Sequence, residues 1–164
     1  MGTMLSGFDL RLRLAELPRD VAAAVPWYQD PQVLRFSEGE GTPPYDATMV
    51  ERMYRYLSEH GELYLIEVRE GKGDWHAIGD ATLCRDSLPL VIGEPEYRSR
   101  GLGKRVLRLL IDRARELGWA ELQVKRVFTY NARSRRLFEG AGFTLAGSGN
   151  DEDGRPYWSF RLSL

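Results

Sequence analysis

Arg98-Ser99-Arg100-Gly101-Leu102-Gly103-Lys104 is the stretch that decides the fold of this chain. It follows an apolar run, Leu88–Ile92, and precedes a strongly amphipathic segment, so it is predicted to join a strand to a helix. The first N–H groups of a helix have no partner within the helix, and the helix dipole is positive at that end. Glycine has no Cβ and lets the backbone approach a ligand closely. With its three basic side chains, the stretch predicts a site for an anion larger than one phosphate.

The spacing of this stretch, Arg-x-x-Gly-x-Gly, excludes two common phosphate-binding motifs. The nucleotide P-loop has four residues between its glycines, followed by Gly-Lys-Ser/Thr, and the dinucleotide fingerprint has a third glycine further on. Neither pattern is present here. A nucleotide-binding regulator is therefore the least favoured function.

Composition limits the remaining classes. The chain has 164 residues, of which 43% are apolar and 29% charged, which is typical of one globular domain. Its net charge of −1 argues against a nucleic-acid-binding protein. The single cysteine, Cys84, suits a reducing compartment, and the separated His60 and His76 do not suggest a metal site. No apolar run is long enough to span a membrane and no signal peptide is evident, so we expect a cytoplasmic protein without membrane partners.

Periodicity predicts alternating strands and helices in one α+β domain over residues 1–164. Asp46 or Thr48 is expected to cap one helix, Gly61 to end it, and Asn131 to cap another. Short helical pieces are expected over 18–36. The expected strands are 8–14, 63–68, 75–84, 88–92, 121–128, 143–146 and 157–162, and the longer expected helices run from 46 or 48 to 61, over 102–117 and over 131–141.

This order of elements resembles the fold of the GCN5-related N-acetyltransferases, the GNAT family. The stretch at 98–104 is similar to the family's diphosphate-binding loop, and Asn131–Phe143 is similar to its Asn-x-x-Ala/Ser…Phe/Tyr-Glu-x-x-Gly-Phe segment. The resemblance implies a mixed, mostly antiparallel central sheet of about six or seven strands with about four helices. The fourth and fifth strands, here 88–92 and 121–128, would be splayed apart.

The resemblance also implies acetyl-CoA as cofactor. Backbone groups of the strand that contains Val91 and Ile92 would pair with the pantetheine arm, as an added strand would. The N–H near Ile92 would face the oxyanion formed from the thioester. The helix that begins at Asn131 would contribute further contacts. The implied cofactor-binding residues are Val91, Ile92, Arg98, Ser99, Arg100, Gly101, Leu102, Gly103, Lys104, Asn131, Ser134 and Phe138, with no metal.

The catalytic residues are less clear from the sequence. Aminolysis of a thioester needs a group that accepts a proton from the amine. Glu94, two residues beyond Ile92, is the first candidate, and Asp80, which we expect to face a cleft, is the second. The family's usual general acid is a tyrosine, but Phe138 occupies that position. Either another group, with Tyr130 a weak candidate, protonates the thiolate, or the thiolate leaves unaided.

The function predicted is transfer of an acetyl group to a primary amine, on a small molecule or a peptide or protein N-terminus, by direct attack in a ternary complex. The alternative is a non-catalytic acyl-CoA-binding module, for which Phe138 is the one hint. Acidic and aromatic residues before the first long helix, Trp27-Tyr28, Glu38 and Glu40, would suit a cationic acceptor. The acceptor's identity and a homodimer through sheet edges are left open.

Overall fold

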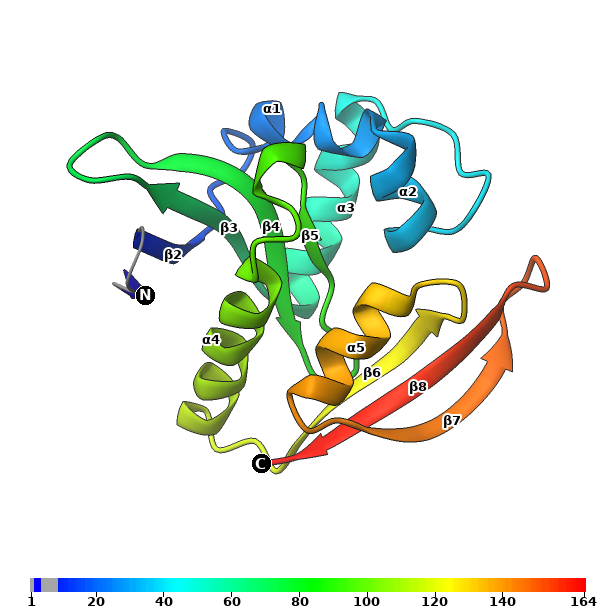
Figure 1. Cartoon of the computed structure of the whole chain (residues 1–164). Helices are drawn as coiled ribbons and strands as arrows, with labels where there is room; N and C mark the ends of the chain where they lie inside the picture. Colours follow the sequence, from blue (N-terminus) through cyan, green and yellow to red (C-terminus); the bar gives the residue numbers. More distant parts are fainter. Residues whose placement is uncertain (1, 4–8) are drawn as a thin grey trace. The chain divides into compact units, whose positions relative to one another are not determined.

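The computed structural model describes residues 2–3 and 9–164 (Figure 1). Phe8, expected to start the first strand, lies outside these residues. In chain order the elements are β1 (Gly2–Thr3), β2 (Asp9–Leu14), α1 (Val21–Ala24), the 3-10 turn η1 (Trp27–Gln29), α2 (Pro31–Ser37), α3 (Ala47–His60), β3 (Gly61–Arg69), β4 (His76–Cys84), β5 (Leu90–Ile92), the 3-10 turn η2 (Pro95–Tyr97), α4 (Leu102–Glu116), β6 (Glu121–Phe128), α5 (Ala132–Gly140), β7 (Thr144–Asn150) and β8 (Pro156–Ser163).

These elements form two compact units. The first unit runs to Thr82 and takes in Pro89–Arg100, and the second comprises Leu83–Leu88 and Gly101–Leu164. Among the residues that the structure describes, no helix combines the length and the apolar composition that crossing a bilayer requires.

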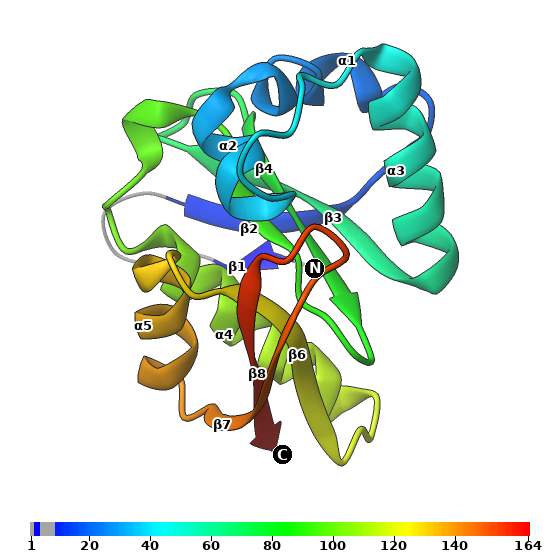
Figure 2. The same cartoon turned by 90° about the vertical axis from the view of Figure 1, so that its right-hand side faces the viewer.

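The first unit is built on a five-stranded sheet in the order β1-β2-β3-β4-β5. Helix α3 packs beside β3, and α1 and α2 accompany it (Figures 1 and 2). Asp46 caps α3 by accepting a hydrogen bond from the Met49 N–H, and the helix ends at Gly61, as predicted. The core contains fully buried side chains from β3 and α3, such as Leu65 and Tyr54.

Strand β5 is the outer strand of this sheet and lies unusually close to β4. Gly79 of β4 pairs with Ile92 of β5. A Cβ at Gly79 would come within 1.9 Å of the Val91 carbonyl oxygen, so only glycine allows this approach. Gly93 and Glu94 then both donate their N–H groups to the Ile78 carbonyl, at 2.7 and 3.0 Å, which is the pattern of a β-bulge.

The second unit contains α4, α5 and a three-stranded antiparallel sheet in the order β6-β8-β7, drawn from yellow-green to red in Figure 1. Helix α4 buries a continuous apolar stripe that includes Leu107 and Leu110. Helix α5 packs on the sheet through Phe138, whose ring lies 5.3 Å from that of Phe143 and 6.5 Å from that of Phe160. Phe138 is therefore part of the core of this unit.

The α+β fold is confirmed, with differences in detail. Within residues 2–3 and 9–164, β5 ends the first sheet and β6 belongs to a second one, so the described strands divide into sheets of five and three. Strand β1 was not predicted, because two residues carry no readable period. Leu14, the last residue of β2, is 58% exposed.

Candidate active site

The loop at 98–104 has a backbone suited to an anion. Gly101 adopts a left-handed conformation, with φ of 78°, and Ser99 has φ of 60°. Helix α4 starts immediately afterwards at Leu102, and its N-cap, Gly101, has no side chain to accept a hydrogen bond from the first turn. The N–H groups of that turn thus have no side-chain cap and are available to an anionic ligand.

Arg98, the first residue of the loop, lies within the first unit. Its guanidinium donates to the carbonyl oxygens of Ile92, at 2.9 Å, and Gly93, at 3.0 Å, and to the Asp30 carboxylate, at 3.0 Å. These bonds tie the end of β5 to the N-cap of α2. The sequence suggested phosphate binding for this side chain and contained no sign of this structural role.

The backbone of Ile92 faces the free edge of β5. The Thr82 N–H bonds to the Pro89 carbonyl, and the Gly93 N–H bonds to the Ile78 carbonyl. Because hydrogen-bonding residues alternate in an antiparallel pair, the N–H and C=O of Ile92 point away from β4. The Ile92 carbonyl is used by Arg98, so the Ile92 N–H is the donor that the edge offers at this point.

Glu94 follows the bulge and is held by an indole. The Trp27 Nε1–H donates to the Glu94 carboxylate at 3.1 Å. The same indole covers Gly93, where a Cβ would lie within 2.1 Å of the ring, so that glycine is required there. Trp27 itself is only 2% exposed and cannot easily shift. The bulge and the indole together fix the position of the Glu94 carboxylate, two residues after Ile92.

The expectation that Asp80 faces a cleft is wrong. Its side chain is fully buried, and one oxygen, Oδ2, accepts hydrogen bonds from the hydroxyls of Tyr28, at 2.7 Å, and Tyr54, at 2.6 Å. Two hydroxyl donors make burial of a carboxyl group tolerable, which the sequence could not reveal. Tyr54 lies one helical turn after the buried Val50 on α3. This four-residue spacing was the only feature of the sequence that indicated an inward-facing Tyr54.

Burial raises the pKa of Asp80 to about 6, against the opposing effect of the two tyrosine hydrogen bonds. Between about pH 4 and pH 6 the folded protein then binds more protons at Asp80 than the unfolded chain does. The free energy of unfolding should therefore fall as the pH rises through this window, by on the order of 2–3 kcal/mol. The Asp80→Asn variant should lack this slope. Urea unfolding of both proteins from pH 4 to pH 7 measures the free energy of unfolding. The same pH dependence in the wild type and in Asp80→Asn would contradict the raised pKa of Asp80.

In the second unit the predicted helix cap is present. The Asn131 side-chain oxygen accepts a hydrogen bond from the Ser134 N–H at 3.1 Å, and α5 follows directly. Asn131 is 7% exposed. Phe138 is 5% exposed and packs against two other rings, so its position is explained by packing. A contact of Asn131, Ser134 or Phe138 with a cofactor stays a prediction.

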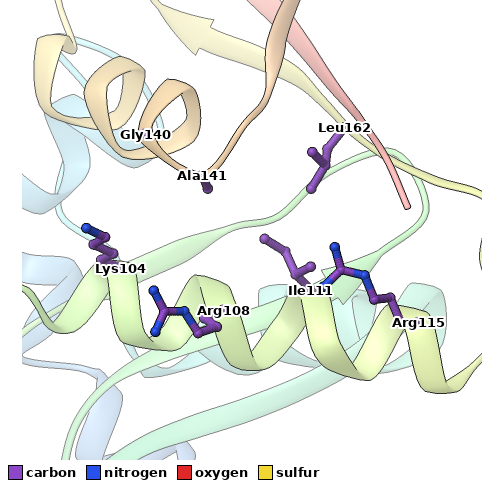
Figure 3. Close-up of a pocket in the computed structure, with 7 residues that line it drawn as sticks. All are labelled: Lys104, Arg108, Ile111, Arg115, Gly140, Ala141 and Leu162. Atoms are coloured by element: carbon purple, nitrogen blue, oxygen red, sulfur yellow. The ribbon is translucent and has the colours of Figure 1, made fainter.

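A basic pocket in the second unit was not predicted. Figure 3 shows Lys104 and Arg108 on the side of α4 that faces the end of α5, at Gly140 and Ala141. Ile111, Arg115 and Leu162 complete the lining. The amphipathic pattern of this helix places Lys104 and Arg108 on its polar face, and the expected site residues included Lys104 but not Arg108. Only the approach of α5 within this unit turns that face into a pocket suited to an anion.

The comparison with protein families gives one match. The model of a family described as the acetyltransferase (GNAT) domain matches residues 10–144. None of the curated proteins compared with the chain matches it.

Solved structures share the fold at low identity. The aminoglycoside acetyltransferase AAC(6')-Ib in complex with coenzyme A and kanamycin is 17% identical, with 94% of each chain covered and a TM-score of 0.73. YncA from Salmonella typhimurium with its cofactor acetyl-CoA is 20% identical, with 94% of each chain covered and a TM-score of 0.68. A GNAT-family acetyltransferase from Streptococcus pneumoniae is 22% identical, covering 94% of this chain and 99% of that one, with a TM-score of 0.67. At these identities the likeness concerns the fold.

Proposed function

Because this chain belongs to the GNAT acetyltransferase family, we propose that it transfers an acetyl group from acetyl-CoA to a primary amine by direct attack in a ternary complex. The observation that carries the proposal is the bulge at the end of β5. There the carboxylate of Glu94 accepts a hydrogen bond from Trp27, and Glu94 lies two residues after Ile92, whose N–H faces the free edge of β5. A hydrogen-bond donor and a proton acceptor at this spacing are what aminolysis of a thioester requires.

The donor side of the proposal uses the loop and the β5 edge. The backbone N–H groups from Ser99 to Lys104 would hold the diphosphate, with the side chains of Arg100 and Lys104 adding charge. The free edge of β5 at Ile92 would pair with the pantetheine amides, whereas the backbone groups of Val91 face β4. Acetyl-CoA as donor is supported by the family match and by the coenzyme A or acetyl-CoA in the complexes of similar fold.

In the reaction, the amine nitrogen attacks the acyl carbon, and the Ile92 N–H donates to the oxyanion that forms. Glu94 accepts the proton that the nitrogen loses as the C–S bond breaks. We assign this role to Glu94 rather than to Asp80, because Asp80 is buried beneath two tyrosines. A thiol pKa near 8.5 lets the thiolate leave without an acid, so Phe138 at the usual tyrosine position is compatible with turnover.

The chain would act as one catalytic domain, since the family match spans parts of both compact units. The test is release of coenzyme A from acetyl-CoA with and without a panel of primary amines. The panel should include kanamycin, because a protein of similar fold forms a complex with it. Amine-dependent release, with acetylated amine identified by mass spectrometry, supports the proposal. Acetyl-CoA binding without transfer to any amine would favour the non-catalytic acyl-CoA-binding module.

Trp27→Phe tests whether the indole positions Glu94. Phenylalanine keeps an aromatic ring over Gly93 but removes the donor to the Glu94 carboxylate. We expect kcat to fall about tenfold, the scale of one hydrogen bond to a charged group, with acetyl-CoA affinity unchanged. In a Glu94→Gln background, Trp27→Phe should lower kcat only slightly further, because the two residues act as a pair. Equal losses in both backgrounds would assign Trp27 a packing role alone.

A further inference from the structure

The bulge at the end of β5 is held by hydrogen bonds from two directions. It consists of two peptide groups, one between Ile92 and Gly93 and one between Gly93 and Glu94. Both N–H groups donate to the Ile78 carbonyl, at 2.7 and 3.0 Å. Both carbonyl oxygens accept from the guanidinium of Arg98: Nε lies 2.9 Å from the Ile92 oxygen, and Nη2 lies 3.0 Å from the Gly93 oxygen. Arg98 and Ile78 therefore clamp the bulge between them.

The hydrogen bonds of this clamp reinforce one another. A carbonyl that accepts from a cation makes the N–H of its own peptide group a stronger donor, because the charge polarises the whole amide. The guanidinium of Arg98 therefore strengthens the bonds that the Gly93 and Glu94 N–H groups make to Ile78. Hydrogen bonds from a charged donor are themselves stronger than neutral ones. Loss of Arg98 should thus loosen the backbone that carries Glu94.

The guanidinium is in turn anchored on α2. Its Nη2 lies 3.0 Å from Asp30 Oδ2, while Asp30 Oδ1 caps α2 by accepting from the Gln32 N–H at 2.9 Å. Trp27, whose indole donates to the Glu94 carboxylate, precedes Asp30 by three residues. The segment from Trp27 to Gln32 thus reaches the bulge twice, directly at the Glu94 side chain and through Arg98 at the backbone. The Arg98 side chain is only 16% exposed, as expected for a group whose donors are used within the protein.

Arg98 also limits what the free edge of β5 can bind at Ile92. The N–H and C=O of Ile92 both face that edge, and the guanidinium covers the C=O. The N–H is therefore the group that a ligand can use there. A thioester carbonyl is an acceptor and needs only this donor.

We propose that Arg98, anchored by Asp30, is a positioning residue of the acetyl transfer. It fixes the bulge so that the Ile92 N–H and the Glu94 carboxylate keep the spacing that the reaction needs. It acts through the backbone and leaves the diphosphate to the N–H groups and the other cations of the loop. This inference rests on the proposed function and adds to it a role for the side chain that opens the loop motif.

Arg98→Lys separates positioning from phosphate binding. Lysine keeps the charge that would attract a phosphate, but its single nitrogen cannot reproduce the fork that bonds to two carbonyls and a carboxylate. We expect kcat to fall at least about tenfold, the scale of one lost hydrogen bond to a charged group, with acetyl-CoA affinity in calorimetry unchanged. Wild-type kcat in folded Arg98→Lys would overturn the inference.

A donor that lacks the diphosphate sharpens the test. S-acetylpantetheine carries the same thioester but has neither the diphosphate nor the adenosine. Arg98→Gln should lower kcat/KM by the same factor with this donor as with acetyl-CoA, because the bulge serves the thioester. Arg100→Gln is the contrast, since Arg100 is assigned to the diphosphate, and its loss should appear with acetyl-CoA alone. A loss in Arg98→Gln that is confined to acetyl-CoA would overturn the inference.

Asp30→Asn tests the anchor with a milder change. Asparagine keeps an oxygen that can cap α2 but removes the charge that holds the guanidinium. We expect kcat to fall about threefold, with little further fall when the change is combined with Arg98→Gln, because Asp30 acts through Arg98. Asp46→Asn is the same substitution at the N-cap of α3 and should leave kcat as in the wild type. Wild-type kcat in Asp30→Asn, or equal falls in both single variants, would overturn the inference.

Amide hydrogen exchange separates this inference from the proposed function, because it needs no acetyl transfer. NMR of the wild type and of Arg98→Gln compares the Gly93 and Glu94 amides with that of Leu65 in the buried strand β3. We expect the two bulge amides to exchange at least about tenfold faster in the variant, with Leu65 unchanged. Faster exchange in a protein that acetylates no amine would retain the clamp and reject the proposed function. Transfer to an amine with unchanged exchange and unchanged kcat in Arg98→Gln would retain the acetyltransferase and overturn the inference.

Discussion

Gly103→Asp is expected to weaken acetyl-CoA binding at least about hundredfold, because it removes charged hydrogen bonds that are each worth about 1.5–3 kcal/mol. Gly103 lies in the first turn of α4, one residue after the helix begins at Leu102. An aspartate there would place a carboxylate where the diphosphate is proposed to lie. Its own oxygen would also accept from the N–H groups that should bind phosphate. Isothermal titration with acetyl-CoA measures the loss.

The control for this variant is Gly147→Asp. Gly147 lies on the exposed strand β7, and a Cβ there has no atom within 4 Å. The same charge is thus added to the same unit, away from the loop, and acetyl-CoA affinity should not change. Circular dichroism establishes that both variants are folded. If folded Gly103→Asp binds acetyl-CoA as tightly as the wild type, the loop at 98–104 is not the diphosphate site.

Glu94→Gln is expected to lower kcat/KM by about 10²-fold, the low end for loss of a general base. The substitution keeps the size of the side chain and an oxygen that can accept the Trp27 hydrogen bond. Acetyl-CoA affinity should stay nearly constant, because Glu94 is assigned to the acceptor.

Steady-state kinetics distinguish two roles for Glu94. If the carboxylate accepts the proton, kcat falls, whereas if it only binds the ammonium form of the acceptor, KM rises and kcat is retained. Wild-type kinetics across pH 6–9 would remove Glu94 from the mechanism.

The sequence by itself determined the order of elements and the local features of the loop. Helix boundaries followed from capping residues, as at Asp46 and Asn131, because a cap acts within three residues of its own position. The amphipathic period of α4 and the two glycines of the loop were likewise readable, since periodicity and backbone conformation are local properties. These features were sufficient to indicate the GNAT family, which the family match then confirmed.

Only the tertiary structure decided what surrounds the candidate catalytic groups. Trp27 and Glu94 are separated by 67 residues, and Tyr28 and Asp80 by 52. No period or local spacing links such pairs, so the sequence placed Asp80 at a cleft when two distant hydroxyls allow it to be buried. Arg98 belongs to a phosphate-loop motif, yet its side chain bonds to Asp30 and to the end of β5. The direction of a side chain and its partners depend on how the packed sheet and helices bring remote segments together, and that information is not local.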